Sequence, residues 1–549
     1  MESMRGFFIL GLAICSFLLY QAWQKDYGPK PQQEVNEQFA QAATVANSKV
    51  ENDNLVEVVT DVFKIKIDRV GGDVVYAELN DYNKELNNEA EKVVLFDYRA
   101  REYKAKSALL GYGAPDYKCK LAGVSEVKCP NNERTRVAYN VEKSSFELTQ
   151  GNDELIVPLS WQNKDGVSFT KVFKFKRNSY QIDVEYKITN NSANDRNYVF
   201  STEIVRDSKP TGLEEKSSFG MSPFTGVAYS PEERKYEKIA FKDLAEEPIK
   251  VTRQGGWVGY LQHYFISAWI PEQTATVSIE SKVKGDITTI RLAQKNIAVP
   301  AQSEKAISAT LYVGPKILKR LEAAAPGLEK ALDLSWVWWI GLPLYKLMQF
   351  FYGLVGNWGF VIILVTIVVK GLLYPLSAAQ YRSMANMRKL APKMQQLKER
   401  YGEDKQRMQQ EMMKMYKEEG ANPFGGCLPM LLQFPIFIAL YYVLFEAVEL
   451  RHAPFFGWIQ DLSVADPYFV LPILMGGSMW LMQKLQPQSP TMDPMQQKIM
   501  SYLPVVFTVF MLFFPAGLVL YWLCNNLISV TQQQYITKKV EKKGLVKAK

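Results

Sequence analysis

Residues 362–375 read IILVTIVVKGLLYP, an apolar stretch that contains a single lysine, Lys370. No other charged residue occurs from Phe360 to Pro375, so the segment is apolar enough to lie in lipid. A lysine near the centre of a bilayer costs about 2.5–3.5 kcal/mol on insertion scales. The stretch therefore predicts a membrane-spanning helix whose lysine either lines a wet interior or extends its long side chain to the nearby membrane surface.

The remainder of the 549-residue chain divides into two unlike halves. Residues 24–330 are polar and mixed in charge, whereas residues 336–537 contain long apolar runs with charges confined to the gaps. The formal net charge of +8 is a mild excess, so its meaning depends on where the basic residues lie along the chain. The composition predicts several domains, one part exposed to water and one part in a membrane.

The N-terminus carries another apolar run. Arg5 is followed by GFFILGLAICSFLLYQAW, and no charge occurs before Lys25. A cleaved signal peptide would end in small residues, but Trp23 stands where one is expected, so we predict an uncleaved transmembrane anchor over residues 1–24 with Arg5 in the cytoplasm. Residues 25–54 are rich in Gln, Asn, Ala and charge, which predicts a disordered linker.

Residues 55–330 show the two-residue alternation of half-buried β-strands. The clearest segments are VFKIKID (62–68), FTKVFKFK (169–176), YQIDVEYKI (180–188), ATVSIESKV (275–283) and KAISATLYV (305–313). KRNSY (176–180) separates two of them and predicts a hairpin turn. So many alternating segments predict a large antiparallel β-sandwich, with helical sequence only near its C-terminal end.

Two cysteines, Cys119 and Cys129, lie within this sandwich region. Outside the cytoplasm they can form a disulfide that closes a short loop, and this pairing is our prediction. Two unpaired thiols would show the same spacing, so the sequence leaves both states open.

The second half begins with an interfacial segment. The aromatic-rich run from 334 to 356 contains a single charge, Lys346, and so we predict an amphipathic helix at the membrane interface over residues 331–356. The core that follows, residues 357–537, begins with the span that contains Lys370, at about 357–376.

Four further spans complete the predicted core. One ends near Val448, and the next covers 468–485. The uncharged run 499–537 would be about 60 Å long as one helix, too long for a single crossing of a ~30 Å hydrocarbon core. FPAG at 514–517 divides that run into two spans, so five core spans and the N-terminal anchor make six transmembrane helices.

The distribution of basic residues predicts the orientation of these spans. The segment 377–422 contains ten Lys or Arg residues and the tail 538–549 contains six lysines, whereas the loop 449–467 has only Arg451. Basic loops stay in the cytoplasm, so both termini should be cytoplasmic and the sandwich should lie outside. Segment 377–422 has methionine stripes at helical spacing, which either pack a helical hairpin together or offer an adaptable apolar surface to partners.

Sequence motifs of catalysis are missing from the chain. It contains no phosphate-binding loop, no H-E-x-x-H, no C-x-x-C and no G-x-S-x-G, and its two histidines, His263 and His452, are far apart in the sequence. We therefore expect a protein that is not an enzyme, with no catalytic residue, cofactor, metal site or ATP hydrolysis.

Several segments together resemble one family. They are GWVGYLQHYFISAWIP (256–271), VVKGLLYPLSAAQYRSMANMRKLAPK (368–393), NPFGGCLPMLLQFPIFIALYYVL (422–444), DPMQQKIMSYLPVVFTVF (493–510) and FPAGLVLYWLCNN (514–526). In content and order they are similar to the YidC membrane-protein insertases, and the large outer sandwich resembles the Gram-negative bacterial form.

The resemblance implies an insertase and chaperone that inserts and helps fold membrane proteins through a hydrophilic groove open to the lipid. It implies this activity alone or with the Sec translocon. Lys370 occupies the position where the family usually has the arginine of the groove. The other matched groove positions are Thr366, Gln433, Asn525, Asn526 and Trp522. The matched positions of a path for the substrate's apolar span are Phe434, Pro435, Phe437 and Phe510, for which ordinary helix packing is the alternative.

The resemblance also implies partners and a location. The partners are nascent membrane proteins, the Sec translocon, membrane lipids, and the ribosome and targeting factors at the hairpin and basic tail; attraction of the tail to anionic lipid is the alternative. No sequence-specific nucleic acid is expected. The location is the bacterial inner membrane, with the sandwich in the periplasm. A transporter would instead show inverted repeats, and a receptor would show a cytoplasmic signalling domain; the sequence has neither pattern.

Overall fold

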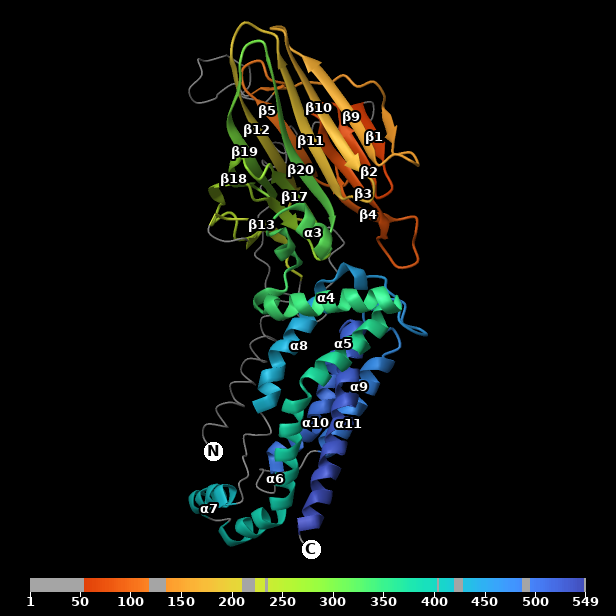
Figure 1. Cartoon of the computed structure of the whole chain (residues 1–549), viewed down its shortest axis with the longest axis vertical. Helices are drawn as coiled ribbons and strands as arrows, with labels where there is room; N and C mark the ends of the chain where they lie inside the picture. The colour runs from red at the N-terminus through yellow and green to blue at the C-terminus, as the bar shows by residue number, and fades with distance from the viewer. Residues whose placement is uncertain are drawn as a thin grey trace, which may run out of the picture.

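The structure is a computed structural model that describes residues 54–117, 135–209, 223–232, 236–401, 404–418, 428–485 and 494–547. Strands form one end of the molecule and helices the other (Figure 1). Some sequence predictions lie outside the described residues: the anchor over 1–24, the linker over 25–54 apart from Asn54, and the pair Cys119 and Cys129. These predictions stay predictions.

The described strands form two facing sheets. The twelve-stranded sheet contains β1 (Leu55–Val59), β2 (Phe63–Asp68), β3 (Asp73–Asn83), β4 (Lys92–Asp97), β5 (Tyr103–Leu110), β6 (Asp116–Tyr117), β7 (Thr135–Arg136), β8 (Ser145–Glu147), β12 (Arg196–Asp207), β15 (Lys250–Gln254), β18 (Thr276–Lys284) and β19 (Ile287–Val299). The eight-stranded sheet contains β9 (Glu154–Gln162), β10 (Val167–Lys176), β11 (Gln181–Asn190), β13 (Gly226–Tyr229), β14 (Glu237–Ala240), β16 (Val258–Leu261), β17 (Phe265–Pro271) and β20 (Ser303–Pro315).

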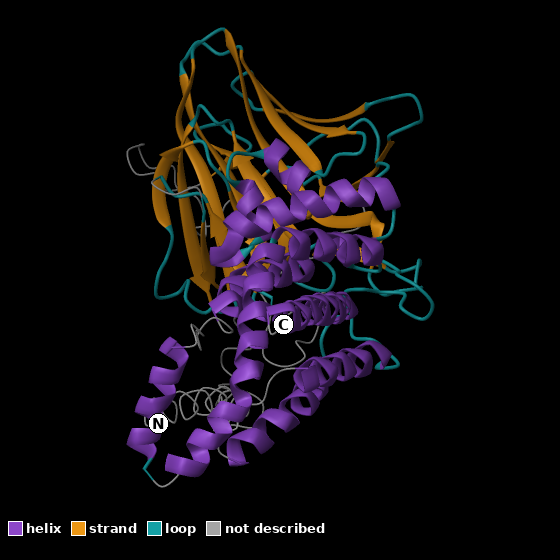
Figure 2. Ribbon diagram, turned by 60° about the horizontal axis from the view of Figure 1, so that its bottom comes forward, coloured by secondary structure: helices purple, strands orange, loops and turns teal. Residues whose placement is uncertain are grey.

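The order of strands is β15-β18-β19-β12-β5-β3-β2-β1-β8 in the larger sheet, with β4, β6 and β7 off this path, and β14-β13-β16-β17-β20-β11-β10-β9 in the smaller. Nearly all neighbours are antiparallel, which confirms the predicted sandwich; β1–β8 and β5–β6 pair in parallel. Figure 2 shows the helices gathered at one end of these curved sheets.

Local sequence explains the strands. In β2 every second side chain, beginning with Phe63, is buried, as the alternation predicts. Strands β10 and β11 pair in register from Val167 with Asn190 to Phe175 with Ile182, and the predicted turn KRNSY joins them. Asn178 in that turn has a φ of 53°, a left-handed conformation that asparagine adopts more readily than most residues. The hairpin prediction is confirmed.

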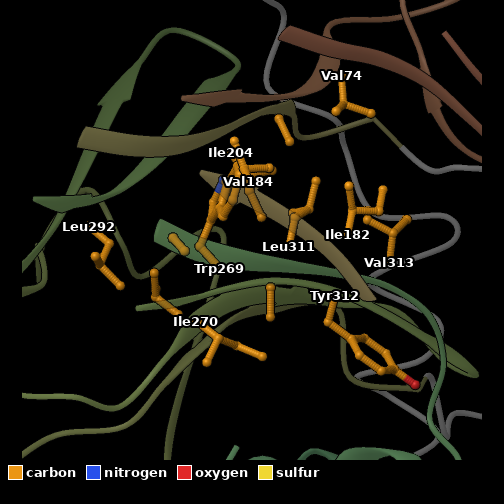
Figure 3. Close-up of a cluster of buried hydrophobic side chains, with 14 of the residues drawn as sticks. Val74, Ile182, Val184, Ile204, Trp269, Ile270, Leu292, Leu311, Tyr312 and Val313 are labelled. Atoms are coloured by element: carbon orange, nitrogen blue, oxygen red, sulfur yellow. The ribbon is translucent and has the colours of Figure 1, made fainter. Parts of the chain in front are cut away.

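The core of the sandwich lies between its two sheets. Figure 3 shows side chains from both sheets in one cluster, including Ile204 and Leu292 of the larger sheet and Val184, Trp269 and Leu311 of the smaller. The indole of Trp269 also donates a hydrogen bond of 3.0 Å across the sheets to the carbonyl of Glu203. Each such buried side chain contributes about 1.5–3 kcal/mol by burial alone.

A buried charge network lies beside this core. Lys171 is fully buried, and burial lowers its pKa to about 7. Its ammonium donates to three backbone carbonyls, those of Gly71 at 2.9 Å, Gly72 at 2.6 Å and Ser107 at 3.0 Å. Nearby, the Arg136 guanidinium forms ion pairs with Asp73 and, at 2.6 Å, with Asp116. Each charged group named here thus has a charged or a backbone partner, although Oδ1 of Asp73 is buried without a hydrogen bond from the described residues.

The helical half follows the sandwich. Its elements are α3 (Leu318–Ala324), η3 (Leu328–Leu332), η4 (Ser335–Val337), α4 (Trp338–Val355), α5 (Trp358–Leu372), α6 (Tyr374–Tyr401), α7 (Lys405–Glu418), α8 (Leu428–Glu446), η6 (Val448–Leu450), α9 (Val470–Leu485), α10 (Pro494–Met511) and α11 (Ala516–Lys547). Helix α4 lies across the molecule between the sandwich and the remaining helices (Figure 1). The predicted helical hairpin is present as α6 and α7.

The helix boundaries differ from prediction at two places and agree at one. The span predicted over 357–376 is not one straight helix: α5 ends at Leu372 and α6 continues at an angle of 66°. Pro375 explains the bend, because it has no N–H to continue the helical hydrogen bonds. The predicted break at FPAG is confirmed by the gap between α10 and α11. Helix α11 continues past the predicted end of the last span, residue 537, to Lys547.

The lengths and compositions of the helices bear on membrane crossing. Over the described ranges, no single helix is long and apolar enough to cross a membrane, while the bent pair Trp358–Leu372 and Tyr374–Met387 together passes. Shorter apolar helices are Gln433–Glu446 and Lys498–Met511. The prediction of six transmembrane helices stays a prediction.

The sandwich and the helical half meet at His263, in the turn between β16 and β17. This side chain is 2 % exposed, and its Nε2 lies 2.9 Å from the carbonyl of Phe445 near the end of α8. Because a carbonyl can only accept, Nε2 carries the proton. Burial, and then the positive charges of Lys316 and Arg451, lower the pKa of His263 to about 3.

We therefore expect acid to destabilise the folded chain through His263. The unfolded imidazole has a pKa near 6.5. The contribution of neutral His263 to the free energy of unfolding is fully present above about pH 6.5. Between about pH 6.5 and about pH 3, about 1.4 kcal/mol of this free energy is lost per pH unit. Melting temperatures of the full chain in detergent should fall across this window more steeply for wild type than for His263→Gln. His452→Gln, at the less buried second histidine, is the control. Identical pH profiles for wild type and His263→Gln would contradict this.

Candidate functional site

Helix α5 places Lys370 inside the helical half. The helix begins after Asn357, whose side chain accepts a hydrogen bond of 3.2 Å from the backbone N–H of Phe360 and so caps the first turn. Helix α11 packs against the buried face of α5. On that face Thr366 is 1 % exposed and Lys370 is 3 % exposed. The ammonium therefore lies among helices and not at the surface of the described protein.

The ammonium of Lys370 is held by α11. Its Nζ donates to the Oγ of Ser529 at 2.9 Å, and Ser529 in turn donates to the carbonyl of Asn525 at 2.6 Å. Among the residues that the structure describes, no carboxylate forms an ion pair with Lys370. An ammonium without a counter-charge in a buried place attracts negative charge strongly, because the effective dielectric constant there is low.

Other predicted groove residues also meet α11. Gln433 of α8 donates to the side-chain oxygen of Asn525 at 3.3 Å. Asn526 donates to the hydroxyl of Ser478 in α9 at 3.0 Å. Consecutive residues of a helix are 100° apart around its axis, so Asn525 and Asn526 face different neighbours. The structure thus connects Lys370, Ser529, Asn525 and Gln433, and places Asn526 in a second contact.

Thr366 shares a face of α5 with Lys370, but its hydroxyl bonds to the backbone of its own helix. Its hydroxyl donates to the carbonyl of Ile362, one turn earlier in α5, at 2.6 Å. The side chain therefore satisfies its own helix backbone, as buried threonines in helices commonly do. It remains beside Lys370 on the buried face of α5 without a hydrogen bond to it among those of the described residues.

Sequence reasoning missed three polar residues of this region. Ser529 contacts Lys370, Ser478 contacts Asn526, and Gln533 donates to the carbonyl of Leu485 at 3.1 Å. A signal for one of them was present: Ser529 is four residues after Asn525, so the two share a helix face. Extending the polar stripe of the last span by one turn would have found it.

The four residues predicted to line a substrate path lie at or beside one row of aromatic rings, which we call the aromatic row. Its members, with ring-centroid distances between neighbours, are Phe434 and Phe437 at 6.5 Å, Phe437 and Trp522 at 4.5 Å, Trp522 and Phe507 at 4.6 Å, and Phe507 and Phe510 at 6.3 Å. The row crosses from α8 over α11 to α10.

Two members of the aromatic row were not among the residues predicted for the substrate path. Trp522, assigned to the groove, lies in the row between rings from α8 and α10. Phe507 was missed, although it is three residues before Phe510 on the same helix face. Phe434 is 57 % exposed, so the row begins at a surface. Half-buried Pro435 follows Phe434 directly in α8.

Comparisons with known proteins agree over the whole chain. The family model described as YidC periplasmic domain matches residues 55–347, and the one described as 60Kd inner membrane protein matches residues 350–543. The membrane protein insertase YidC of Shewanella halifaxensis is 46% identical over 561 residues, covering 99% of this chain and 100% of the relative. That of Actinobacillus succinogenes is 45% identical over 552 residues, covering 99% of each.

A solved structure described as an active YidC insertase with the first transmembrane domain resolved is also similar. It is 18% identical, has a TM-score of 0.37, and covers 88% of this chain and 92% of that chain. By sequence identity along its full length and by both family models, the chain belongs to the YidC family of membrane protein insertases, inner-membrane proteins of bacteria that carry a periplasmic domain.

Proposed function

We propose that this insertase moves the polar tail of a substrate past Lys370, in a hydrophilic groove bounded by α5, α8 and α11. The observation that carries the proposal is the buried ammonium of Lys370, held by Ser529 with no carboxylate paired to it within the described ranges. Asn525 and Gln433 extend this polar region toward α8. Water or a passing tail can exchange hydrogen bonds with these groups, which lowers the cost of the buried charge.

The substrate has two parts, and each meets a different surface. Acidic side chains of the tail are attracted to Lys370, whereas the apolar span slides along the aromatic row, beginning at exposed Phe434. Burial of the span in lipid supplies about 25 cal/mol per Å² of apolar surface. The membrane potential adds about 2.3 kcal/mol per acidic charge per 100 mV. Insertion of short tails therefore needs no ATP hydrolysis.

The proposed topology has six membrane crossings. The anchor over 1–24 and five spans within 357–537 would place the hairpin 377–422 and the tail 538–549 in the cytoplasm. Helix α4 and the short η4 would lie at the interface. Their large exposed apolar side chains support this placement: Trp336, Trp338, Trp339, Phe350, Tyr352 and Leu354.

Membership of an insertase family makes nascent membrane proteins the substrates of this chain. An insertase is not an enzyme in the usual sense, and we assign no catalytic residue. We further propose that longer polar domains require the Sec translocon. Ribosomes and targeting factors would dock at the cytoplasmic hairpin and basic tail, and the spans would contact membrane lipids.

Photo-crosslinking during insertion tests the groove and the aromatic row separately. A photo-reactive residue at Asn525 should capture the tail of a single-span substrate stalled in proteoliposomes, and one at Phe434 should capture its apolar span. The reason is that polar groups surround Asn525 while Phe434 is an exposed aromatic ring. The measurement is mass spectrometry of the crosslinked substrate peptides.

A control position is available in the sandwich. A photo-reactive residue at Tyr112, which is 53 % exposed, should capture neither part of the substrate above background. If a photo-reactive residue at Asn525 captured the apolar span as efficiently as the tail, the proposal that the groove and the aromatic row contact different parts of the substrate would be wrong.

A further inference from the structure

The chain between η6 and α9 buries its charges and exposes its aromatic rings. We call residues 453–469 the outer loop. Its only charged residues are Asp461 and Asp466, which are 7 % and 1 % exposed. Its large exposed apolar residues are Phe456, Trp458, Val464, Tyr468 and Phe469. A loop surrounded by water normally exposes its charges, so this inversion needs a physical explanation.

The two buried carboxylates hold the outer loop in shape. Asp466 accepts hydrogen bonds from the indole N–H of Trp458 at 2.9 Å and from the backbone N–H of Tyr468 at 3.0 Å. Asp461 accepts from the backbone N–H of Ser463 at 2.8 Å and from its hydroxyl at 2.7 Å. These donors stabilise carboxylates that would otherwise be costly to bury. Trp458 and Tyr468 are thereby held beside one carboxylate.

The outer loop covers the N-terminus of α11. The backbone N–H groups of Ala516 and Gly517, in the first turn of α11, have no partner within the helix. They donate instead to the carbonyls of Val464 at 2.7 Å and of Leu462 at 2.9 Å. Leu462 is buried and belongs to the core of the helical half. One side of the loop is thus part of the core, and the exposed rings lie where the core leaves the loop uncovered.

The outer loop is also held on the first turn of α5. The side-chain amide of Asn357 donates to the carbonyls of Pro454 at 3.2 Å and of Phe455 at 3.1 Å. A Cβ at Gly359 would collide with the ring of Phe455, so glycine permits this close approach. The ring centroid of exposed Phe360 lies 5.4 Å from that of Phe455. The loop is therefore fixed to the outer ends of both α5 and α11.

The exposed rings of the outer loop are continuous with apolar faces of the helices. Ile473 and Leu474, near the start of α9, are exposed and soon follow the loop in the chain. Figure 1 shows the segment between α8 and α9 at the level of α4, at the end of α5 nearest the sandwich. The proposed topology places the outer membrane surface at this level.

An exposed apolar patch of this kind marks a contact with a membrane or with another protein. Aromatic side chains gather at membrane surfaces because an apolar ring with a polar tip suits the boundary between headgroups and acyl chains. Two observations favour lipid over protein as the partner. The patch continues onto helix faces that the proposed topology places in lipid, and it lies level with the interfacial helix α4.

We propose that the outer loop is an interfacial anchor, whose exposed aromatic side chains lie among the phospholipid headgroups of the outer leaflet. The anchor holds the outer ends of α5, α9 and α11 at the membrane surface. The loop contains no basic residue, so anchoring requires neither anionic lipid nor low salt. This inference rests on the proposed function only through the topology, and it makes no claim about the groove or about insertion.

Fluorescence quenching by brominated lipids measures the depth of the outer loop. The full chain, with its five cysteines replaced by serine, carries the fluorophore NBD at Phe456→Cys in proteoliposomes of phosphatidylcholine and phosphatidylglycerol. Bromine placed high in the acyl chains should quench this dye about twofold more than bromine near the bilayer centre, because the ring lies at headgroup level. Vesicles of phosphatidylcholine alone should give the same ratio. Should Phe456→Cys not accumulate, exposed Tyr468→Cys reports on the same surface.

Control positions calibrate the depth and the topology. Val506→Cys, exposed on α10 within a proposed span, should be quenched more by the deep bromine than by the shallow one. Tyr112→Cys, exposed on the sandwich, should be quenched by neither. An impermeant thiol reagent added outside the inner membrane should label exposed Gln460→Cys. Labelling only after that membrane is opened would contradict the topology, and this failure is distinct from a failure of the depth measurement.

Removing the rings tests whether they hold the loop in the interface. Phe456→Ser combined with Tyr468→Ser should reduce shallow quenching of NBD at Val464→Cys by about half or more, because the exposed rings are the groups that favour the interface. Thermal unfolding should not change. Equal quenching at Phe456→Cys and Tyr112→Cys would overturn the anchor. A dye shielded from water but not quenched by lipid, whose emission changes when the protein is diluted in lipid, would indicate a second copy of the chain and would also overturn it.

Discussion

Replacing Lys370 with alanine should slow insertion of a substrate with an acidic translocated tail by about tenfold or more. A charge at 8 Å in an environment of effective dielectric constant near 20 contributes about 2 kcal/mol, and each 1.4 kcal/mol is a factor of ten. Lys370→Glu should be slower still, because it repels the tail and buries an unpaired carboxylate. Lys370→Arg should retain insertion, since Arg keeps the charge near Ser529. A tail without charge should depend little on Lys370.

The measurement is protease protection of the translocated tail in proteoliposomes with matched amounts of each variant. Lys346→Ala is the control, because that lysine is 56% exposed and lies outside the proposed groove. If Lys370 only extended to the membrane surface, its replacement would alter insertion of both substrates equally and through protein abundance alone. Equal insertion of the acidic tail by wild type, Lys370→Ala and Lys370→Glu would contradict the proposed role of the Lys370 charge.

The second large effect concerns the stability of the sandwich. Arg136→Leu should reduce its unfolding free energy by about 3–5 kcal/mol, the cost of removing one partner from a buried ion pair. Two carboxylates lose their partner at once: Asp116 is 1 % exposed and Asp73 is 6 % exposed. Burial already raises the pKa of Asp116 despite the neighbouring guanidinium, so removing Arg136 should drive this carboxyl toward its protonated form.

Thermal or urea unfolding of the full chain in detergent measures this loss. The unfolded fraction of the sandwich is determined from how readily a protease cleaves the sandwich at each temperature or urea concentration. Lys64→Met is the matched control: Lys64 lies 3.6 Å from Glu57 at the surface, and such exposed pairs contribute at most about 1 kcal/mol. Arg136→Lys should fall between the two, because lysine keeps the charge but lacks the fork that reaches both carboxylates and the carbonyls of Gly71 and Ser107. A melting profile of Arg136→Leu equal to that of Lys64→Met would contradict the prediction.

Local sequence is sufficient to predict many of the strands, turns and helix breaks of the fold. The alternation of VFKIKID and YQIDVEYKI predicts strands because successive side chains on a strand point to opposite faces. KRNSY predicts the turn at Asn178, and FPAG predicts the break between α10 and α11, because backbone sterics act over a few residues. The apolar run continues through Leu372 to Pro375 and so predicts one straight span, whereas the helix bends there because Pro375 has no N–H to continue the helical hydrogen bonds.

The candidate site was predicted in part. A lone lysine in an apolar run marks Lys370 through the cost of burying charge, and resemblance to a family supplied Gln433, Asn525 and the aromatic positions. The partner Ser529 is 159 residues away in sequence, so no periodic pattern connects it to Lys370. Whether Asn525 or Asn526 faces α8 likewise depends on the rotation of α11 against its neighbours.

The sequence by itself determined the division into a strand half and a helical half, the local boundaries of many elements, and the presence of one charge that needs an explanation. These follow from side-chain periodicity and backbone sterics, which act within a few residues. Only the tertiary structure decided which side chain meets the ammonium of Lys370, and that Lys316 and Glu446, 130 residues apart, join the two halves. Such pairs are set by how packed elements rotate and approach one another, and that information is distributed over the whole core.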